Sequence, residues 1–147
     1  MSNTSFEEIY DLFLMEIKDY KLNRLVSSEL TIYLEGFLML AIPDFDNCVK
    51  DLEDFDLSLG TFNSNLNLRE KTIVSKIMVL KWLGKEINDV TQFNLHLNDS
   101  DFKHYAEGQN LKEKVEYSNR MREIISQDML QYGIKNTPWS AWANGSF

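Results

Sequence analysis

Residues 67–84 read Asn-Leu-Arg-Glu-Lys-Thr-Ile-Val-Ser-Lys-Ile-Met-Val-Leu-Lys-Trp-Leu-Gly, and they form the most apolar helical pattern in the chain. Asn67 followed three residues later by Glu70 has the spacing of a capping box, which begins a helix. Apolar residues then recur three and four positions apart, as one face of a helix requires, and Gly84 is a residue type that commonly ends helices. We therefore predict a helix over about 68–83, at the centre of the core.

The chain before this stretch has the same kind of pattern. Ser5 with Glu8 is a second capping box, and it predicts a helix over about 6–18. Another apolar stripe at helical spacing starts near residues 27 and 28, and Pro43 stops it because proline cannot continue a helix.

Apolar residues at steps of three and four predict a helix of about twenty residues, over about 110–132, that ends at Gly133. Between the two strong C-terminal patterns, residues 89–96 favour a short helix or turn, and Asp99 or Ser100 has the chemistry of a helix cap. That cap would start a further helix at Phe102.

Residues 43–67 are rich in Asp and Asn and show no helical period. Within them, Leu57, Leu59 and Phe62 favour a short extended piece around Gly60. The fold class that follows is all-α, a small bundle of four or five helices with this irregular acidic segment and an extended C-terminal tail. We expect one helical domain over 1–133 and a tail over 134–147. The predicted core contains Phe13, Leu34, Leu38, Ile77, Leu80, Leu83, Val115, Ile125 and Met129.

The charge of the chain is uneven. Residues 1–60 hold four Lys or Arg against thirteen Asp or Glu, a net charge of −9, whereas residues 61–147 hold eleven against ten. A surface of this sign repels phosphate and disfavours groove-reading nucleic-acid binding. It suits ordinary solubility, mimicry of nucleic acid, or a wall past which DNA slides without sticking. The most acidic run includes Asp51, Glu53, Asp54 and Asp56.

Other features narrow the function classes. No run of 18 or more apolar residues is present to cross a bilayer, so we expect no membrane partner. Cys48 is the single cysteine and favours a reducing compartment. No phosphate-binding glycine loop, nucleophile elbow or Cys-His pairing is present, which predicts that the protein is not an enzyme and needs no cofactor.

Two motifs have some resemblance to metal sites. Asp54, Asp56 and Ser58 alternate like the start of a calcium loop, but Leu59 stands where that loop needs glycine. The cluster of His96, Asp99, Asp101 and His104 favours helix capping with surface histidines over a metal site. An enzyme with a metal near these histidines is the remaining catalytic alternative, and we predict no metal.

The last residues, 133–147, contain large rings after a helix-breaking proline. Rings of this size are uncommon in a solvated tail, so they are expected to be buried, either on the chain's own domain or on a partner. The predicted docking residues are Pro138, Trp139, Trp142 and Phe147.

Three parts of the chain carry a resemblance to a known family: the run from Glu70 to Leu83, the segment Asp99-Ser100-Asp101-Phe102-Lys103, and the charged helix that ends in Gln131-Tyr132-Gly133. Across about residues 60–135, the chain resembles head–tail connector proteins, also called adaptor or neck proteins, of tailed bacteriophages that infect Gram-positive hosts.

The resemblance implies a structural virion protein of the neck, assembled in the host cytoplasm. Such a protein docks on the portal protein as a ring, typically of twelve copies, extends the DNA channel without binding DNA specifically, and receives the next neck or tail-completion protein. It also implies that residues 135–147 reach the portal. The charge of the acidic run, independently, suits the wall of such a channel or its opening, because a negative surface does not bind DNA. The alternative from another class is an acidic regulator that binds a protein, for example as a mimic of nucleic acid.

Overall fold

The computed structural model describes residues 3–17, 27–96 and 101–137, and places their side chains except at 27, 90–96 and 101–110. The helices are α1 (Phe6–Glu16), α2 (Ser27–Ala41), α3 (Leu68–His96) and α4 (Asp101–Lys135), with a 3-10 helix, η2 (Ile42–Asp44). Three two-residue strands complete the described elements: β1 (Thr4–Ser5), β2 (Phe55–Asp56) and β3 (Thr61–Phe62). The predicted fold class, a small bundle of mostly helical structure, is therefore confirmed.

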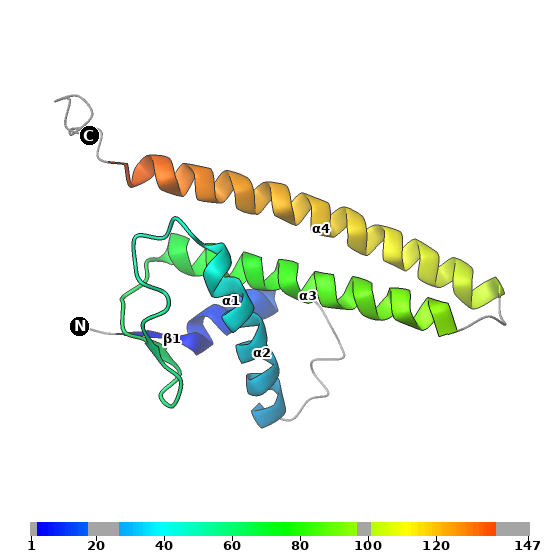
Figure 1. Ribbon diagram of the computed structural model, residues 1–147, viewed down its shortest axis with the longest axis horizontal. Coiled ribbons are helices and arrows are strands. Elements are labelled where there is room, and N and C mark those ends of the chain that lie inside the picture. Colours follow the sequence, from blue (N-terminus) through cyan, green and yellow to red (C-terminus); the bar gives the residue numbers. More distant parts are fainter. Residues whose placement is uncertain (1–2, 18–26, 97–100, 138–147) are drawn as a thin grey trace.

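The two longest helices determine the shape of the molecule. Helices α3 and α4 lie side by side as a long antiparallel hairpin, and α1 and α2 pack against the half of α3 that begins the hairpin (Figure 1). The other half of the hairpin extends beyond α1 and α2 (Figure 1). The strands and the acidic segment gather at the end where α4 finishes, so this end brings together the N-terminal and C-terminal parts of the chain.

Both capping boxes predicted from the sequence are confirmed. The Glu8 carboxylate accepts from the Ser5 backbone N–H at 3.0 Å, and Ser5 caps the start of α1. The Asn67 side chain accepts from the Glu70 N–H at 2.8 Å, while Glu70 Oε1 accepts from the Asn67 N–H at 2.8 Å. The first N–H groups of a helix have no hydrogen-bond acceptor within the helix. Each of these caps provides acceptors for two such N–H groups.

The predicted end of the central helix at Gly84 is wrong, because α3 continues through it to His96. Gly84 is exposed and has open space around it, so it costs the helix only its low propensity, about 1 kcal/mol relative to alanine. The extension is tied to the hairpin partner by an ion pair between Glu86 and Lys114 at 3.3 Å. These contacts outweigh the local preference of one glycine.

Helix α4 also differs from its prediction at both ends. It is one helix from Asp101, where a separate helix from Phe102 and a later one were expected, and it passes Gly133 to end at Lys135. A Cβ atom on Gly133 would lie 3.2 Å from the Asn47 side-chain nitrogen, so glycine at this position allows the close approach of a loop. The end of the helix is instead satisfied by Thr137, whose hydroxyl donates to the Gly133 carbonyl at 2.6 Å.

The acidic segment holds a small sheet that the sequence indicated only in part. The strands pair antiparallel in the order β1-β3-β2, with Phe62 opposite both Thr4 and Phe55. Gly60 adopts a positive φ of 65° in the turn before β3, a conformation that favours glycine. Leu57 and Leu59, expected in the extended piece, lie in this turn and are exposed.

Most of the predicted core is buried, and one residue is a clear exception. Val115 on α4 is 38% exposed, because the apolar face on which it lies is not fully covered by other helices. Leu80 and Met129 are partly buried against the core. The six other predicted core residues are buried: Phe13, Leu34, Leu38, Ile77, Leu83 and Ile125.

Candidate functional site

The acidic segment forms its turns with its own carboxylates. Asp56 Oδ1 accepts hydrogen bonds from the Ser58 hydroxyl at 2.6 Å and from the Ser58 N–H at 2.9 Å. The hydrogen bond from the Ser58 side chain is the main reason that the pKa of Asp56 lies below its ordinary value. Asp54 Oδ1 accepts from the Asn63 side chain at 2.7 Å. These two carboxylates therefore hold the β2–β3 turn.

The other two acidic candidates are presented outward. Asp51 and Glu53 are both exposed, and the Asp51 carboxylate accepts from the Glu53 backbone N–H at 3.0 Å. Within the described residues, neither carboxylate forms an ion pair. Of the four candidates, these two are the ones whose carboxylates do not hold the β2–β3 turn.

A buried polar cluster that sequence reasoning missed fixes the segment to the hairpin. Glu70 is 0% exposed, and its Oε2 accepts from the Tyr132 hydroxyl at 2.7 Å across α3 and α4. Its Oε1 accepts from Lys50 Nζ at 3.1 Å. The Val49 N–H donates to the same Tyr132 hydroxyl at 2.9 Å. One side chain of α4 thereby joins the acidic segment and the first turn of α3.

The electrostatics of this cluster keep the carboxylate charged. Burial alone would raise the pKa of Glu70, but hydrogen bonds from Tyr132, the Asn67 N–H and Lys50 outweigh it, and the pKa lies below its ordinary value. Burial, followed by the bond to Glu70, raises the pKa of Tyr132. Burial is also the largest cause of the raised pKa of the Cys48 thiol, the opposite of the change that activates a cysteine nucleophile.

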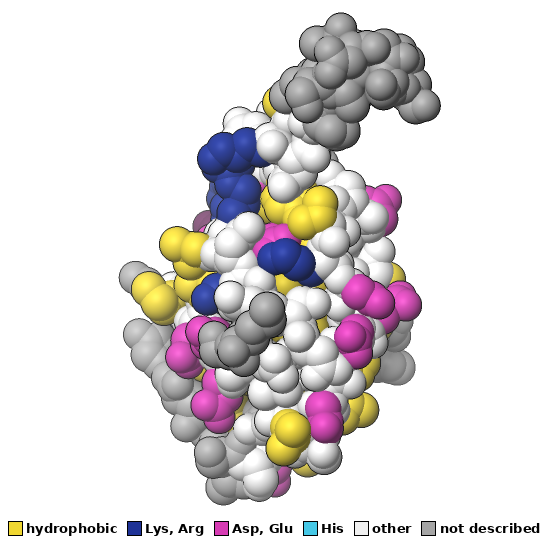
Figure 2. Space-filling view, turned by 90° about the vertical axis from the view of Figure 1, so that its left-hand side faces the viewer, with side chains coloured by type: hydrophobic (Ala, Val, Ile, Leu, Met, Phe, Trp, Pro, Cys, Tyr) yellow, Lys and Arg dark blue, Asp and Glu magenta, His cyan; other side chains and the backbone are white. Residues whose placement is uncertain are grey.

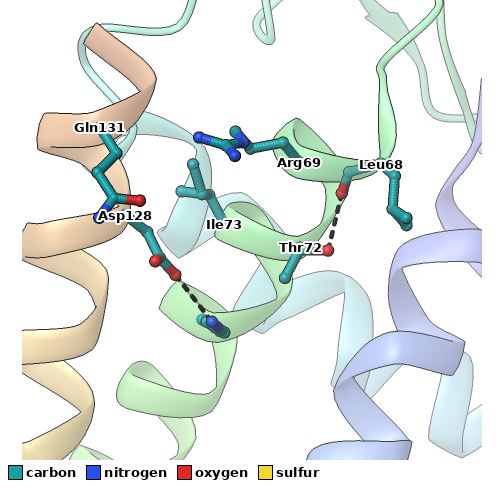
Figure 3. Close-up of a pocket in the computed structure, with 7 residues that line it drawn as sticks. Leu68, Arg69, Thr72, Ile73, Asp128 and Gln131 are labelled. Atoms are coloured by element: carbon teal, nitrogen blue, oxygen red, sulfur yellow. Dashed lines mark hydrogen bonds and ion pairs between the residues drawn. The ribbon is translucent and has the colours of Figure 1, made fainter. Parts of the chain in front are cut away.

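An open pocket of about 450 Å³ lies between the first turns of α3 and the last turns of α4. Figure 3 shows Arg69 reaching from α3 toward the α4 side chains Asp128 and Gln131. Asp128 is engaged by Lys76 at 2.8 Å, whereas Arg69 has no ion-pair partner in the part of the chain that the structure describes. The pocket is lined by Leu68, Arg69, Thr72, Ile73, Lys76, Asp128 and Gln131.

Large apolar side chains are exposed around this end of the hairpin. Leu68 is 67% exposed at the start of α3, and Leu130 and Ile134, one turn apart on α4, are 58% and 50% exposed. Figure 2 shows this face: Lys and Arg side chains lie toward the end of α4, most Asp and Glu side chains lie lower, and hydrophobic side chains are exposed among them. An apolar and basic surface therefore surrounds the point where the described part of α4 ends.

The remaining sequence predictions fall partly outside the described residues. Pro138, Trp139, Trp142 and Phe147 all lie there, as does Asp99 of the histidine cluster. Among the residues that the structure describes, no group of three or more His, Cys, Asp or Glu is placed to hold a metal ion.

The described helices include none that is both long and apolar enough to cross a membrane. Comparison of the chain with protein-family models, with curated proteins and with solved structures gave no match.

Proposed function

We propose that this chain is a head–tail connector of a tailed bacteriophage, a virion protein that docks as a ring on the portal protein and extends the DNA channel toward the tail. The observation that carries the proposal is the apolar surface at the end of α4, where Leu130 and Ile134 are exposed directly before the tryptophan-containing tail. Apolar side chains that are exposed to water do not stabilise a monomer. In a protomer with obligate neighbours, the same side chains are buried in the interface.

The charge distribution supports the same proposal. Asp51 and Glu53 present carboxylates on a segment fixed to the hairpin through Glu70 and Tyr132. A fixed negative surface repels the DNA backbone and lets it pass without binding. In the proposed ring, this segment faces the channel or its opening.

The docking test uses the full chain and a variant truncated after Thr137. Truncation at this point keeps Asn136 and Thr137, whose side chains both donate to the last carbonyls of α4. We expect the truncated protein to unfold at the same temperature as the full chain and to lose binding to the portal protein encoded in the same genome. Portal binding that survives truncation would refute the anchor, and a collapse of stability would show that the tail belongs to the domain's own core.

The channel test reverses charge without breaking the β2–β3 turn, so it leaves Asp54 and Asp56 unchanged. The variant D51K/E53K is compared with E113K/E116K, which makes the same charge change at exposed positions on α4. We expect salt-sensitive DNA retention and reduced packaging for D51K/E53K alone, because added cations on the channel wall bind phosphate. Equal DNA binding by both variants would show that the acidic segment has no special position.

The alternative hypothesis, an acidic regulator that binds a protein, predicts a different oligomeric state. A monomeric or dimeric protein in native mass spectrometry, with or without the portal protein, would favour the regulator over the connector. A ring in the presence of the portal protein favours the connector.

A further inference from the structure

A second pocket, of about 380 Å³, opens between α1, α2 and the β2–β3 turn. None of the residues that line it belongs to α3 or α4, so it is separate from the surface assigned to the portal. Its walls combine apolar groups with carboxylates and hydroxyls. They are formed by Ser5, Phe6, Glu7, Tyr10, Thr31, Glu35, Leu57, Ser58, Leu59 and Gly60.

Tyr10 is the unusual member of this wall. It is only 6% exposed, and its hydroxyl has no hydrogen-bond partner among the described residues. Buried hydroxyls are nearly always paired, and an unpaired one in a native structure often marks the place of a missing partner. Of the three described side chains with such an unpaired atom, Tyr10 is the one that lines this pocket.

Two carboxylates add negative charge beside this hydroxyl. Burial is the largest cause of the raised pKa of Tyr10, and the charges of Glu35 and Glu7 raise it further. The neighbouring Glu8 is paired with Lys71 at 3.5 Å, but Glu7 and Glu35 pair with no cation in the described ranges. The pocket therefore combines negative charge with an unused hydrogen-bonding group.

The mouth of the pocket is preformed. The Phe6 N–H donates to the Gly60 carbonyl at 2.8 Å, and the Gly60 N–H donates to the Asp56 carbonyl at 2.9 Å, which fixes the turn against the start of α1. Leu57 and Leu59 on this turn are 52% and 72% exposed, and they form an apolar rim. A ligand that suits the pocket has a cationic donor group on an apolar stem, and apolar neighbours that cover the rim.

We propose that this pocket binds an arginine side chain presented by a partner protein. A guanidinium group carries several N–H donors for the two carboxylates and the Tyr10 hydroxyl, and it loses less hydration on binding than the strongly hydrated lysine ammonium does. The exposed leucine rim favours a protein partner over a free cation, because only a protein brings apolar side chains beside the charge.

The test titrates the full-length ¹⁵N-labelled protein with the peptide acetyl-Leu-Arg-Leu-amide and follows the backbone signals of Glu35, Leu59 and Gly60. Three matched probes are used: the same peptide with citrulline, which is neutral and similar in shape, the same peptide with lysine, and N-acetyl-arginine amide. We expect the citrulline peptide to bind at least about tenfold more weakly and the other two probes several-fold more weakly. Equal binding of the citrulline peptide would overturn the proposal. Equal binding of N-acetyl-arginine amide would assign the site to a free cation.

Variants separate the pocket from the rest of the surface. E35Q should weaken binding of the arginine peptide by about fivefold, whereas E29Q, which removes the same charge from an exposed position on the same helix, should leave it unchanged. Y10F should keep the fold, with an unfolding temperature at or above that of the parent, and should also weaken binding. Equal effects of E35Q and E29Q would refute the site.

One further variant tests whether the chain fills its own pocket. Arg24 lies outside the described residues, between α1 and α2 in the sequence. We expect R24Q to bind the peptide as the parent does. Tighter binding by R24Q would show that this arginine competes for the pocket, and it would overturn the assignment to a partner.

Discussion

The contact between Tyr132 and Glu70 joins the two long helices at the end where α4 finishes, and Tyr132→Phe removes it with the least disturbance. The variant loses the hydroxyl that donates to Glu70 at 2.7 Å and accepts from the Val49 N–H at 2.9 Å. It keeps the ring, which packs edge-on against Phe45 with centroids 5.0 Å apart. The change therefore isolates one hydrogen-bonded group in a packed setting.

The expected loss follows from the charge and burial of the acceptor. A hydrogen bond to a charged group contributes about 1.5–3 kcal/mol, and Glu70 is fully buried, so water cannot replace the lost donor. The Val49 N–H loses its acceptor as well, and because this hydrogen bond is neutral and only partly buried, it adds a smaller amount. We expect Y132F to lower the free energy of unfolding by about 2–3 kcal/mol, a large part of the roughly 5–15 kcal/mol that stabilises an ordinary domain.

Urea unfolding followed by circular dichroism measures this loss at neutral pH and again in acid. Because the pKa of Glu70 is lowered in the folded state, its contribution is present above the ordinary glutamate pKa of about 4.3 and is lost as the pH falls through the folded pKa. Once Glu70 is protonated, its hydrogen bond with Tyr132 no longer has a charged acceptor and is weaker. The difference between parent and Y132F should thus be largest near pH 7 and smaller below about pH 4.

Tyr117→Phe is the matched control. Its hydroxyl donates to Glu16 at 3.1 Å, but this contact is exposed, so the loss should stay below about 1 kcal/mol. A loss below about 0.5 kcal/mol for Y132F, or one equal to that of Y117F, would refute the role assigned to the buried contact.

Three further predictions test the core, the turn and the thiol. Leu83→Ala should lower the free energy of unfolding by about 2–5 kcal/mol, because Leu83 is 1% exposed, while Leu80→Ala at a half-buried position should cost clearly less; equal losses would contradict the observed packing. Ser58→Ala should raise the pKa of Asp56 toward its ordinary value, which a ¹³C titration of the side-chain carboxyl would detect, and an unchanged titration would exclude the hydroxyl as its main cause. Cys48 should react with iodoacetamide more slowly than a free cysteine at pH 8, because burial raises the pKa of its thiol, and a rate equal to that of free cysteine would show that the thiol is not shielded.

The sequence allowed prediction of features set by neighbouring residues. Both capping boxes depend on side chains three positions apart, and they begin α1 and α3 as expected. Helix ends were less predictable, because a glycine ends a helix only where turning the chain gives more favourable contacts than continuing the helix. Beyond Gly84 the helix is held by an ion pair within α3, Lys85–Asp89, and by one with α4, Glu86–Lys114. At Gly133 the missing side chain makes room for Asn47.

The sequence showed which acidic residues the candidate site contains, but not which side chains contact one another in the folded protein. The acidic run was visible, yet nothing in its spacing indicated that Asp56 holds a turn through Ser58. Glu70 was recognised as a cap, but its second partner, Tyr132, lies 62 positions away, and helical periodicity carries no information about such a pairing. Val115 matched the apolar period of α4 but is 38% exposed, because periodicity does not tell how much of a helix face other helices cover.

The hairpin of α3 and α4 has a mechanical consequence for a chain attached at residue 137. Cross-links between the two helices join residues 28, 52 and 62 positions apart, in order from the hairpin's turn toward its open end. A force that draws the end of α4 away from α3 separates the helices one cross-link at a time, beginning at the open end. The outermost of these links, between Tyr132 and Glu70, takes that load first. This buried contact is therefore the first of the three that would have to break before α4 peels away from α3.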